Sequence, residues 1–403
     1  MRPLIGLVAI FKNEAHAVGR TLASVRHIAG TWTILDTGST DGTQEIVREA
    51  LGGFQGALHE EPFVDFAHAR NRVLELAAAA PEPPVFTLML SADEVVEGAE
   101  ALRDFLDAKR DEPFGAYSVE MRAEHSRWFY PRVLRVGAGW TYVNPVHEVP
   151  LGPNRETHGP VVPGVCIVHA ATDPERRRKR IAEFDLPLLT KLACDESIPI
   201  ADRAQSVWHL AQTHESLAQG TERSPGGEWI CHQMAAMANY WRRVEIGGED
   251  ATKTNYALFR YLNIAERVGF YTHEELLNRL DALSEMEPML AEVRYMIAVH
   301  AAQIDARQGL FYAEEAARVA KDVLGGEPTH VPTDTRLEWL SLHVAAGCAK
   351  QLGRHEYAKT LAERGVAAGG PADQFEEFMT VPPLVPAGEL STEPSPSASL
   401  ASA

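Results

Sequence analysis

Short apolar runs mark the first part of the chain. Residues 5–10, 32–35 and 85–90 consist of apolar side chains, interrupted only by glycine and threonine. Runs of this length and composition are typical of strands that are buried on both faces of a sheet. Further strand signals follow at residues 117–122, 133–136 and 165–168. The pattern therefore predicts a buried sheet in the N-terminal part of the chain.

Helical periodicity fills the gaps between the first three runs. The apolar residues of segment 14–27 recur at helical spacing, and a second helix is expected around residues 46–47. The turn at residues 37–42 offers a Ser or Thr to cap that second helix, and Asp65 opens a third helix. Strands that alternate with helices in this way predict an α/β nucleotide-binding layer.

The pattern changes after residue 173, where strand signals almost vanish. Segments that combine small residues with aromatic ones follow one another, as in antiparallel helices of TPR-like arrays. We expect helices to end at four glycines, Gly220, Gly247, Gly269 and Gly309. The predicted organisation is therefore an α/β domain (1–172), an all-α TPR-like helical domain (173–381) and a disordered Pro/Ser/Ala-rich tail (382–403).

Charge and cysteine content narrow the class of protein. The 403 residues include 38 basic and 56 acidic side chains, a formal charge of −18, which disfavours binding to nucleic acid or anionic lipid through bulk electrostatics. A local basic patch at residues 176–180 could still contact phosphate. There is no apolar run of about 20 residues, as a membrane helix needs, and the N-terminal run is better explained as a strand than as a signal peptide. Four cysteines without a CxxC pair fit a reducing compartment, so we expect a soluble, cytoplasmic protein.

Several standard nucleotide and metal motifs are missing from the sequence. It has no GxGxxG after the first strand, no P-loop and no HExxH, and the turn at residues 36–42 does not follow the calcium-loop pattern. Two acidic strand ends remain, at Asp36 and Asp93. Ligands of open α/β sheets bind at such carboxyl ends, where one carboxylate can contact a base or ribose and another can hold a divalent metal. The alternative is that each aspartate only forms a turn or caps a helix.

A series of motifs in one order resembles the family 2 glycosyltransferases, which have the GT-A fold. The resemblance covers about residues 4–172, and its motifs lie at residues 10–15, 21–25, 34–43, 65–71, 88–94, 128–135 and 146–148. The helical region that follows resembles a bacterial branch in which a TPR-like domain follows the transferase, and some members of that branch glycosylate peptides. The resemblance implies a Rossmann-like GT-A domain that binds a nucleotide-sugar donor, with a UDP-sugar expected.

The resemblance also implies roles for individual residues at the donor site. The segment of Lys12, Asn13 and Glu14 would border the nucleotide, and Asp36 would contact its base or ribose. Residues 91–93 take the place of the family's DxD metal motif, but Ser91 replaces its first acid.

Metal, phosphate and base candidates follow from the same comparison. Asp93 keeps the usual metal position and His169 stands where many GT-A enzymes place a histidine ligand, so Mg²⁺ or Mn²⁺ is expected there. Arg132 could reach the diphosphate or form a surface salt bridge. Glu148 is the candidate base for an inverting transfer, and His147 competes with it as base or metal ligand; both could instead form a strand-end salt bridge.

The sequence thus predicts a metal-dependent, inverting glycosyltransferase that moves a sugar to an acceptor hydroxyl or thiol, on a peptide, a glycan, a small molecule or a modified nucleobase. The acceptor would dock partly on the helical domain, which could instead be a structural brace or a homodimer interface. The charge run at residues 175–180 is either a solvated helix face or an acceptor-docking patch. Two alternatives stay open: a non-catalytic scaffold with a degenerate transferase domain, which Ser91 favours, and a nucleotidyltransferase.

Overall fold

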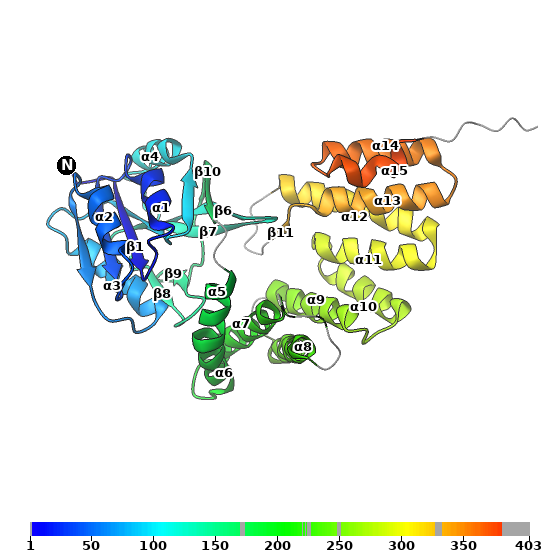
Figure 1. Cartoon of the computed structure of the whole chain (residues 1–403), viewed down its shortest axis with the longest axis horizontal. Helices are drawn as coiled ribbons and strands as arrows, with labels where there is room; N and C mark the ends of the chain where they lie inside the picture. The colour runs from blue at the N-terminus through cyan, green and yellow to red at the C-terminus, as the bar shows by residue number, and fades with distance from the viewer. Residues whose placement is uncertain are drawn as a thin grey trace, which may run out of the picture.

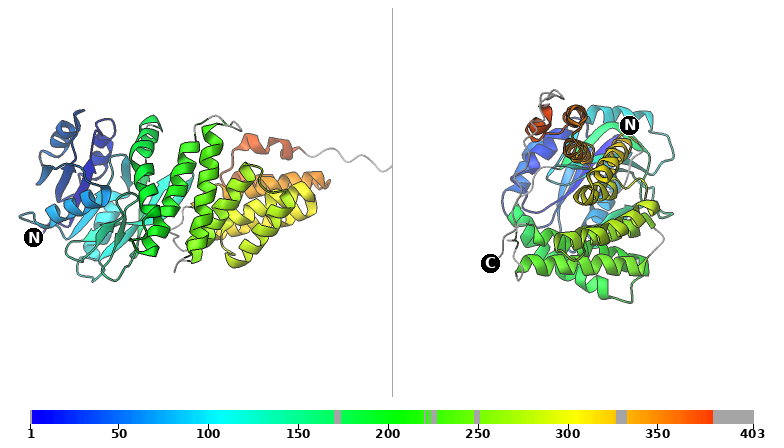
Figure 2. Two further views of the ribbon diagram at one scale, coloured as in Figure 1. Left: turned by 90° about the horizontal axis from the view of Figure 1, so that it is seen from below. Right: turned by 90° about the vertical axis from the view of Figure 1, so that its right-hand side faces the viewer.

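The chain folds into a sheet domain and a helical array that lie side by side along the long axis of the molecule (Figures 1 and 2). The computed structural model describes residues 2–169, 174–219, 221, 223, 227–247, 251–326 and 333–380. The predicted domain boundary at residues 172–173, the helix end at Gly220 and the predicted tail at 382–403 lie outside these residues. Within them, no helix is long and apolar enough to cross a membrane, and all four cysteines are free thiols.

Parallel strands form one half of the main sheet. The strand order is β3-β2-β1-β4-β7-β6-β10-β5, and the first four of these strands run parallel to one another. Their bounds are Ile5–Phe11 for β1, Thr31–Asp36 for β2, Gly56–Glu60 for β3 and Phe86–Leu90 for β4. Strands β1, β2 and β4 coincide with the three predicted apolar runs. Since β1 lies between β2 and β4, the chain order reverses at β1, and a crevice forms at the carboxyl ends of such strands.

The other half of the sheet is mixed. Strand β7 runs antiparallel to β4 and to β6, while β10 is parallel to β6 and antiparallel to β5. The strand signals at residues 117–122, 133–136 and 165–168 correctly located β6, β7 and β10. The bounds are Glu94–Glu97 for β5, Ala116–Ala123 for β6, Ser126–Arg135 for β7 and Val161–His169 for β10; β8 (Thr141–Val143) and β9 (Val149–Leu151) form a separate pair.

Helices cover both faces of the parallel strands, because successive side chains of a buried strand point to opposite faces. Leu7 and Ala9 of β1 join the core formed with α1, α2 and α4, whereas Val8 joins a second core formed with α3. The helices span Val18–Val25 (α1), Thr43–Leu51 (α2), Phe66–Ala78 (α3) and Ala99–Ala108 (α4). Asp65 caps α3 as predicted, since its side chain accepts a hydrogen bond from the His68 N–H.

Two local predictions in this domain were wrong. The helix expected over 14–27 begins only at Val18, because residues 12–15 are held in a loop by side chains of the next turn. The second helix has no Ser or Thr cap. Gly42 is its N-cap residue, and the preceding Asp41 accepts the hydrogen bond from the Thr43 N–H.

The C-terminal region is helical, and consecutive helices pack against each other. Gly247 and Gly269 follow helix ends as predicted, with φ angles of 66° and 69° that favour glycine. Gly309 instead lies inside α12, where a Cβ atom would meet the backbone of Ala302 at 2.6 Å, so this glycine permits close packing of α11 and α12. The helices are α5 (Pro174–Arg180), a π-helical turn (Ile181–Asp185), α6 (Leu186–Cys194), α7 (Ile200–Ala218), α8 (Glu228–Ile246), α9 (Ala251–Arg267), α10 (His273–Met286), α11 (Ala291–Ile304), α12 (Ala306–Gly325), α13 (Leu337–Gln351), α14 (His355–Ala367) and α15 (Glu376–Met379).

The β6–β7 hairpin connects the sheet to the helical array near the C-terminal end of α12. It extends from the sheet toward β11 (Thr333–Asp334), which pairs antiparallel with the start of β7 (Figure 1). The Thr335 N–H donates to the His125 carbonyl at 2.8 Å, and the Arg127 guanidinium donates to the Leu324 carbonyl at 2.8 Å. The helical region is therefore attached to the sheet domain at two separate places, by chain connection through α5 and by this added strand between α12 and α13.

Candidate functional site

The predicted donor-site residues gather at the carboxyl edge of the parallel strands. Lys12, Asn13 and Glu14 follow β1, Asp36 ends β2, and residues 91–93 follow β4. The register pairs Phe11 with Asp36 and Ala9 with Leu90, so these three strands end side by side. Residues that are far apart in sequence therefore meet at the point where the strand order reverses.

Asp36 is buried and carries one oxygen without a partner. Its Oδ1 accepts hydrogen bonds from the N–H groups of Gly38 and Ser39, at 3.0 and 2.8 Å, and from the Gln44 amide at 3.0 Å. Its Oδ2 is buried and has no hydrogen-bond partner among the described residues. An unpaired buried carboxylate oxygen is costly unless a ligand supplies a donor. This oxygen is therefore a candidate acceptor for a ligand N–H or O–H.

The loop after β1 is fastened to the loop after β2. Asn13 has a left-handed backbone, with φ at 57°; its N–H donates to Ser39 Oγ and its side-chain oxygen accepts from the Thr40 N–H, at 2.9 and 2.8 Å. Asp41 accepts from the Ala15 N–H at 3.1 Å and from the Thr43 hydroxyl at 2.5 Å. Burial of the Asp41 carboxylate acts to raise its pKa, but these hydrogen bonds outweigh it and the pKa is lowered. Asp41 thus organises the loop.

The first helix of the C-terminal region contacts this loop. The Arg176 guanidinium of α5 lies 2.9 Å from the Glu14 carboxylate and donates to the Lys12 carbonyl at 2.9 Å. Burial raises the pKa of Glu14, while Arg176 partly offsets this effect. Lys12 is exposed. The charge run is therefore solvated over most of its length, but it also joins the helical region to the donor-site loop.

Behind the DxD position lies a fully buried carboxylate, Glu94. It accepts a hydrogen bond from the Ser91 N–H at 2.8 Å and from the Arg132 guanidinium at 2.5 Å. Arg132 is 7% exposed and Glu94 is 0% exposed, so the pair is in the core rather than on the surface. Arg132 thus forms a salt bridge, which was one of its two predicted roles, but the bridge lies in the core and not on the surface as predicted. Ser91 contributes its backbone N–H to this pair.

Asp93 and His169 both lie at this edge. Asp93 is partly exposed and close enough to act electrostatically on both Glu14 and His169. His169 Nε2 is buried without a hydrogen bond to any described residue, 3.2 Å from Glu94 Oε1, and its ring stacks on Trp128 at 5.7 Å. Burial lowers the pKa of His169, which favours the neutral ring that metals bind. In the described part of the chain, no three His, Cys, Asp or Glu side chains are placed to hold a metal by themselves.

Glu148 forms a buried ion pair with Arg70. The Arg70 Nε donates to Glu148 Oε1, and the two side chains are 10% and 12% exposed. Burial acts to lower the pKa of Arg70, but the Glu148 carboxylate outweighs it and the pKa is raised. Tyr130 donates its hydroxyl to the Glu148 carbonyl at 2.8 Å, and the Arg70 guanidinium lies over the Tyr142 ring. The carboxylate of the candidate base is therefore fixed in orientation.

His147, the competing base, faces the helical region instead. Its ring stacks on that of His209 from α7, with centroids 4.2 Å apart and planes 9° from parallel. The side-chain Nε2 of Gln205 lies 2.6 Å from Nε2 of His209, and Nδ1 of His209 lies 3.0 Å from the side-chain amide oxygen of Gln212. If each amide group acts in its usual role, Gln205 donates to Nε2 and Nδ1–H donates to Gln212, which requires a neutral His209 ring. Burial lowers the pKa of His147 to about 4 and that of His209 as well.

Sequence reasoning missed three residues of this site. Arg70 belongs to a noted motif, but its partner Glu148 is 78 positions away. Glu94 lies at the end of the motif at residues 88–94, but its complete burial was not predicted. Arg177 is an exposed cation of α5 that is close enough to act electrostatically on both His147 and His169.

Comparison with known proteins shows a similarity in the N-terminal region. Residues 7–166 match the model of Glycosyl transferase family 2. A TPR repeat-containing protein of Synechococcus elongatus is 34% identical over 150 residues, which cover 36% of this chain and 35% of that protein. The matched residues therefore span about a third of the length of this relative.

Two crystal structures of S. aureus TarS are similar only at a distant level. One has a TM-score of 0.35 at 12% identity and covers 66% of this chain and 54% of that chain. The other, TarS 1–349 in complex with UDP, has a TM-score of 0.28 at 13% identity and covers 80% of this chain and 92% of that chain.

Because the Glu94–Arg132 pair is buried, we expect the single substitution of Arg132 to lower the free energy of unfolding more than the double substitution of both residues. Arg132→Met leaves a buried carboxylate without its cation, which should lower the free energy of unfolding by about 3–5 kcal/mol. Adding Glu94→Gln removes the unpaired charge and should restore part of that loss. Chemical denaturation followed by circular dichroism measures both. Arg103→Met, at an exposed ion pair with Asp104, is the control and should change the free energy by less than about 1 kcal/mol. Equal destabilisation in the single and double variants would contradict the account.

The stacked histidines predict acid sensitivity. His147 has a pKa of about 4 when folded, against its ordinary value of 6.5. The unfolded chain therefore binds more protons below pH 6.5, so stability falls as the pH drops from about 6.5 to about 4, by at most about 3 kcal/mol from this group.

His147→Asn should flatten that acid limb, because asparagine cannot titrate and tolerates the left-handed backbone at this position, where φ is 52°. The measurement is the thermal unfolding midpoint as a function of pH. His68→Asn, at an exposed position in α3, serves as the control and should keep the wild-type profile. An acid limb that His147→Asn leaves unchanged would show that this ring does not control it.

Proposed function

We propose that the GT-A domain, whose residues 7–166 match the model of Glycosyl transferase family 2, transfers a sugar from a UDP-sugar to an acceptor hydroxyl or thiol, with inversion. The observation that carries the proposal is the convergence of the family's motif residues at the strand-order reversal, together with the unpaired Oδ2 of Asp36. Ligands of open α/β sheets bind at this place. The helical region that follows would bind the acceptor.

The donor nucleotide would lie against the loops after β1 and β2. Asp36 Oδ2 is placed to accept a hydrogen bond from the base or ribose, since it is buried and lacks a donor from the described residues. Lys12, Asn13 and Glu14 would border the same ligand. Lys12 and Arg177 are exposed cations, and Arg177 is close enough to act electrostatically on His169. Their charge would stabilise the departing diphosphate.

A divalent cation, Mg²⁺ or Mn²⁺, would be held by Asp93 and His169. Asp93 suits this ion as a partly exposed carboxylate, and His169 suits it as an imidazole whose Nε2 lies 3.2 Å from Glu94 Oε1 without a hydrogen bond to a described residue. Two protein ligands leave several positions for diphosphate oxygens, which is the usual arrangement for these cations. When bound, the ion would supply charge neutralisation for the leaving diphosphate.

The base that accepts the acceptor's proton would be Glu148. Arg70 fixes one of its carboxylate oxygens, which is the kind of support that an oriented base requires. His147 is a poorer candidate, because burial lowers its pKa to about 4 and its ring is covered by that of His209. A neutral ring with so low a pKa is a weak base near pH 7.

The remaining predictions about the whole protein stay proposals. Free thiols fit a reducing compartment, and we keep the cytoplasm as the expected location. A homodimer and the acceptor's identity stay predictions. The scaffold alternative retains one supporting observation, the serine in place of the first DxD acid.

Turnover without an acceptor tests the proposed function. UDP-sugars and GDP-sugars are incubated with the full chain and Mn²⁺, and release of the nucleoside diphosphate is measured. We expect slow hydrolysis of one UDP-sugar, because water can replace the acceptor. Glu148→Gln removes the base and should lower the rate by about 10²-fold or more. Glu148→Asp keeps the charge beside Arg70 and should fold normally but turn over slowly, because its carboxylate is displaced.

Glu49→Gln is the matched control, since Glu49 is an exposed carboxylate on α2, and it should hydrolyse at the wild-type rate. Full activity in a folded Glu148→Gln protein would remove Glu148 as the base. Absence of hydrolysis and of UDP binding for the wild-type chain would favour the scaffold.

A further inference from the structure

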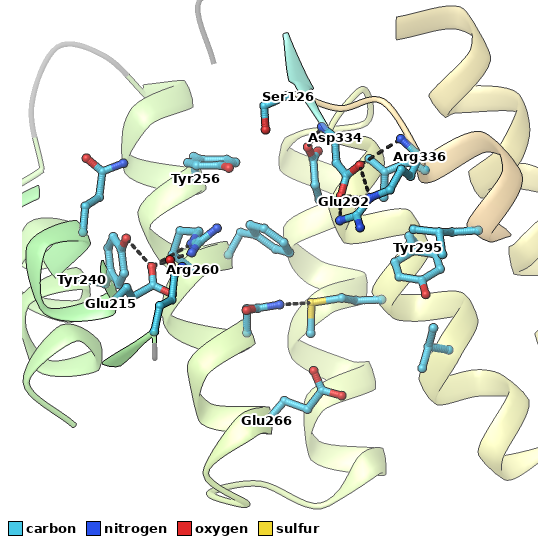
Figure 3. A pocket seen from close by; sticks show the side chains of 18 of the residues that line it. Ser126, Glu215, Tyr240, Tyr256, Arg260, Glu266, Glu292, Tyr295, Asp334 and Arg336 are labelled. Carbon is cyan, nitrogen blue, oxygen red and sulfur yellow. Dashed lines mark hydrogen bonds and ion pairs between the residues drawn. The ribbon is translucent and has the colours of Figure 1, made fainter. Parts of the chain in front are cut away.

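A cavity lies away from the donor site, in the helical region. It has a volume of about 610 Å³ and is lined by residues of α7, α8, α9, α11, α13 and β11 (Figure 3). One residue of the sheet domain, Ser126 at the tip of the β6–β7 hairpin, completes the lining. The cavity is therefore closed in part by the same hairpin that leaves the transferase sheet.

Two carboxylates of the cavity are neutralised within the protein. Glu215 is 4% exposed and accepts hydrogen bonds from Tyr240 at 2.7 Å and from Arg260 at 2.5 Å, with Arg267 at 2.9 Å on its other oxygen. Asp334 pairs with Arg336, whose Nη2 lies 2.8 Å from Oδ2 (Figure 3). The guanidinium groups that line the cavity are thus already committed to partners.

Glu292 has no such partner. Its one hydrogen bond to another described residue comes from the Asp334 N–H at 3.4 Å, and it forms no ion pair with a Lys, Arg or His of the described chain. Burial, helped by the neighbouring Asp334 charge, raises the pKa of Glu292 to about 7, although hydrogen bonds and Arg260 act against this. Tyr256 and Tyr295 line the cavity with it (Figure 3). A partly buried carboxylate among aromatic rings is suited to a cation.

A second unsatisfied group supports a ligand in this cavity. His300 is 1% exposed and lines the cavity, and its Nε2 has no hydrogen-bond partner among the described residues. This nitrogen lies 3.5 Å from the Glu266 carboxylate, the other acidic group of the lining without a guanidinium partner. Buried polar atoms are usually paired, so unpaired ones at a cavity point to a missing partner.

The register of the sheet places the cavity relative to the donor site. Leu88 of β4 pairs with Val133 of β7, and the two strands run antiparallel. The segment from Val133 back to Ser126 therefore extends past the end of β4, on the edge where Asp93 lies. At 3.4 Å per residue, the hairpin tip stands roughly 15–20 Å beyond that edge. An extended polypeptide covers this distance with about five or six residues.

We propose that this cavity binds the alkylammonium or guanidinium group of a basic side chain in a polypeptide acceptor, about five or six residues from the residue that receives the sugar. The spacing part of the proposal rests on the proposed function, whereas the binding part stands on the cavity alone. A polypeptide fits because an extended chain of about five or six residues covers the distance between the two places, and the carboxylates of the cavity and the net charge of −18 repel nucleic acid.

Peptide binding to the full chain tests the proposal, with no donor or metal present. The probe is a fluorescein-labelled Gly/Ser peptide with one central lysine, and its counterpart carries glutamine at that position. Fluorescence anisotropy at low ionic strength should give a dissociation constant about tenfold lower for the lysine peptide. Glu292→Gln should raise it to the level of the glutamine peptide, and Glu266→Gln should raise it by a smaller factor.

Glu363→Gln provides the matched control, because it removes the same charge from an exposed position on α14 and should bind like the wild type. Equal affinity for both peptides, or an unchanged affinity in folded Glu292→Gln, would overturn the proposal. Because the assay uses no sugar donor, its failure is distinct from failure of UDP-sugar hydrolysis. If both hold, moving the lysine along a serine-containing peptide should give a maximum of glycosylation about five or six residues away, and a flat profile would refute the spacing.

Discussion

A fully buried carboxylate, Glu94, is the constraint on which the candidate site depends. Burial of a charge is costly unless cations and N–H groups compensate it. Three parts of the chain meet at this side chain: the Ser91 N–H of the turn after β4, Arg132 of β7, and His169 at the end of β10, with Nε2 3.2 Å away. The turn that carries Asp93 is therefore fixed relative to both neighbouring strands. The contacts that neutralise the Glu94 carboxylate therefore also position the proposed metal ligands, Asp93 and His169.

The helical region is joined to this framework at several places. Arg176 reaches the loop after β1, His209 stacks on His147 beside the candidate base, and β11 pairs with β7. Strand β7 contributes to both the donor-site edge and the cavity, because it contains Arg132 of the buried pair and Ser126 of the cavity lining. The two functions that we propose for the chain, donor binding and acceptor binding, would thus share one strand. We infer that the helical array is positioned for a substrate that spans both places.

Local patterns were enough to predict much of the fold. The apolar runs located β1, β2 and β4, Asp65 was correctly read as a helix cap, and the acidic strand ends were correctly placed at one edge. Strand β5 was missed because it is short and begins and ends with glutamate. Gly309 was misread as a helix end because close contact with Ala302 depends on a neighbouring helix. Pairings such as Arg70 with Glu148 and β11 with β7 join distant segments, and nothing in the local sequence encodes them.

The carboxyl edge of the sheet is the proposed binding site of a nucleoside diphosphate together with a divalent cation. Isothermal titration of UDP into the full chain, with and without Mn²⁺, tests this proposal most directly. We expect binding that strengthens by about tenfold or more with Mn²⁺ and loses that gain in Asp93→Asn. UDP binding that is absent, or a gain from Mn²⁺ that persists in folded Asp93→Asn, would contradict it.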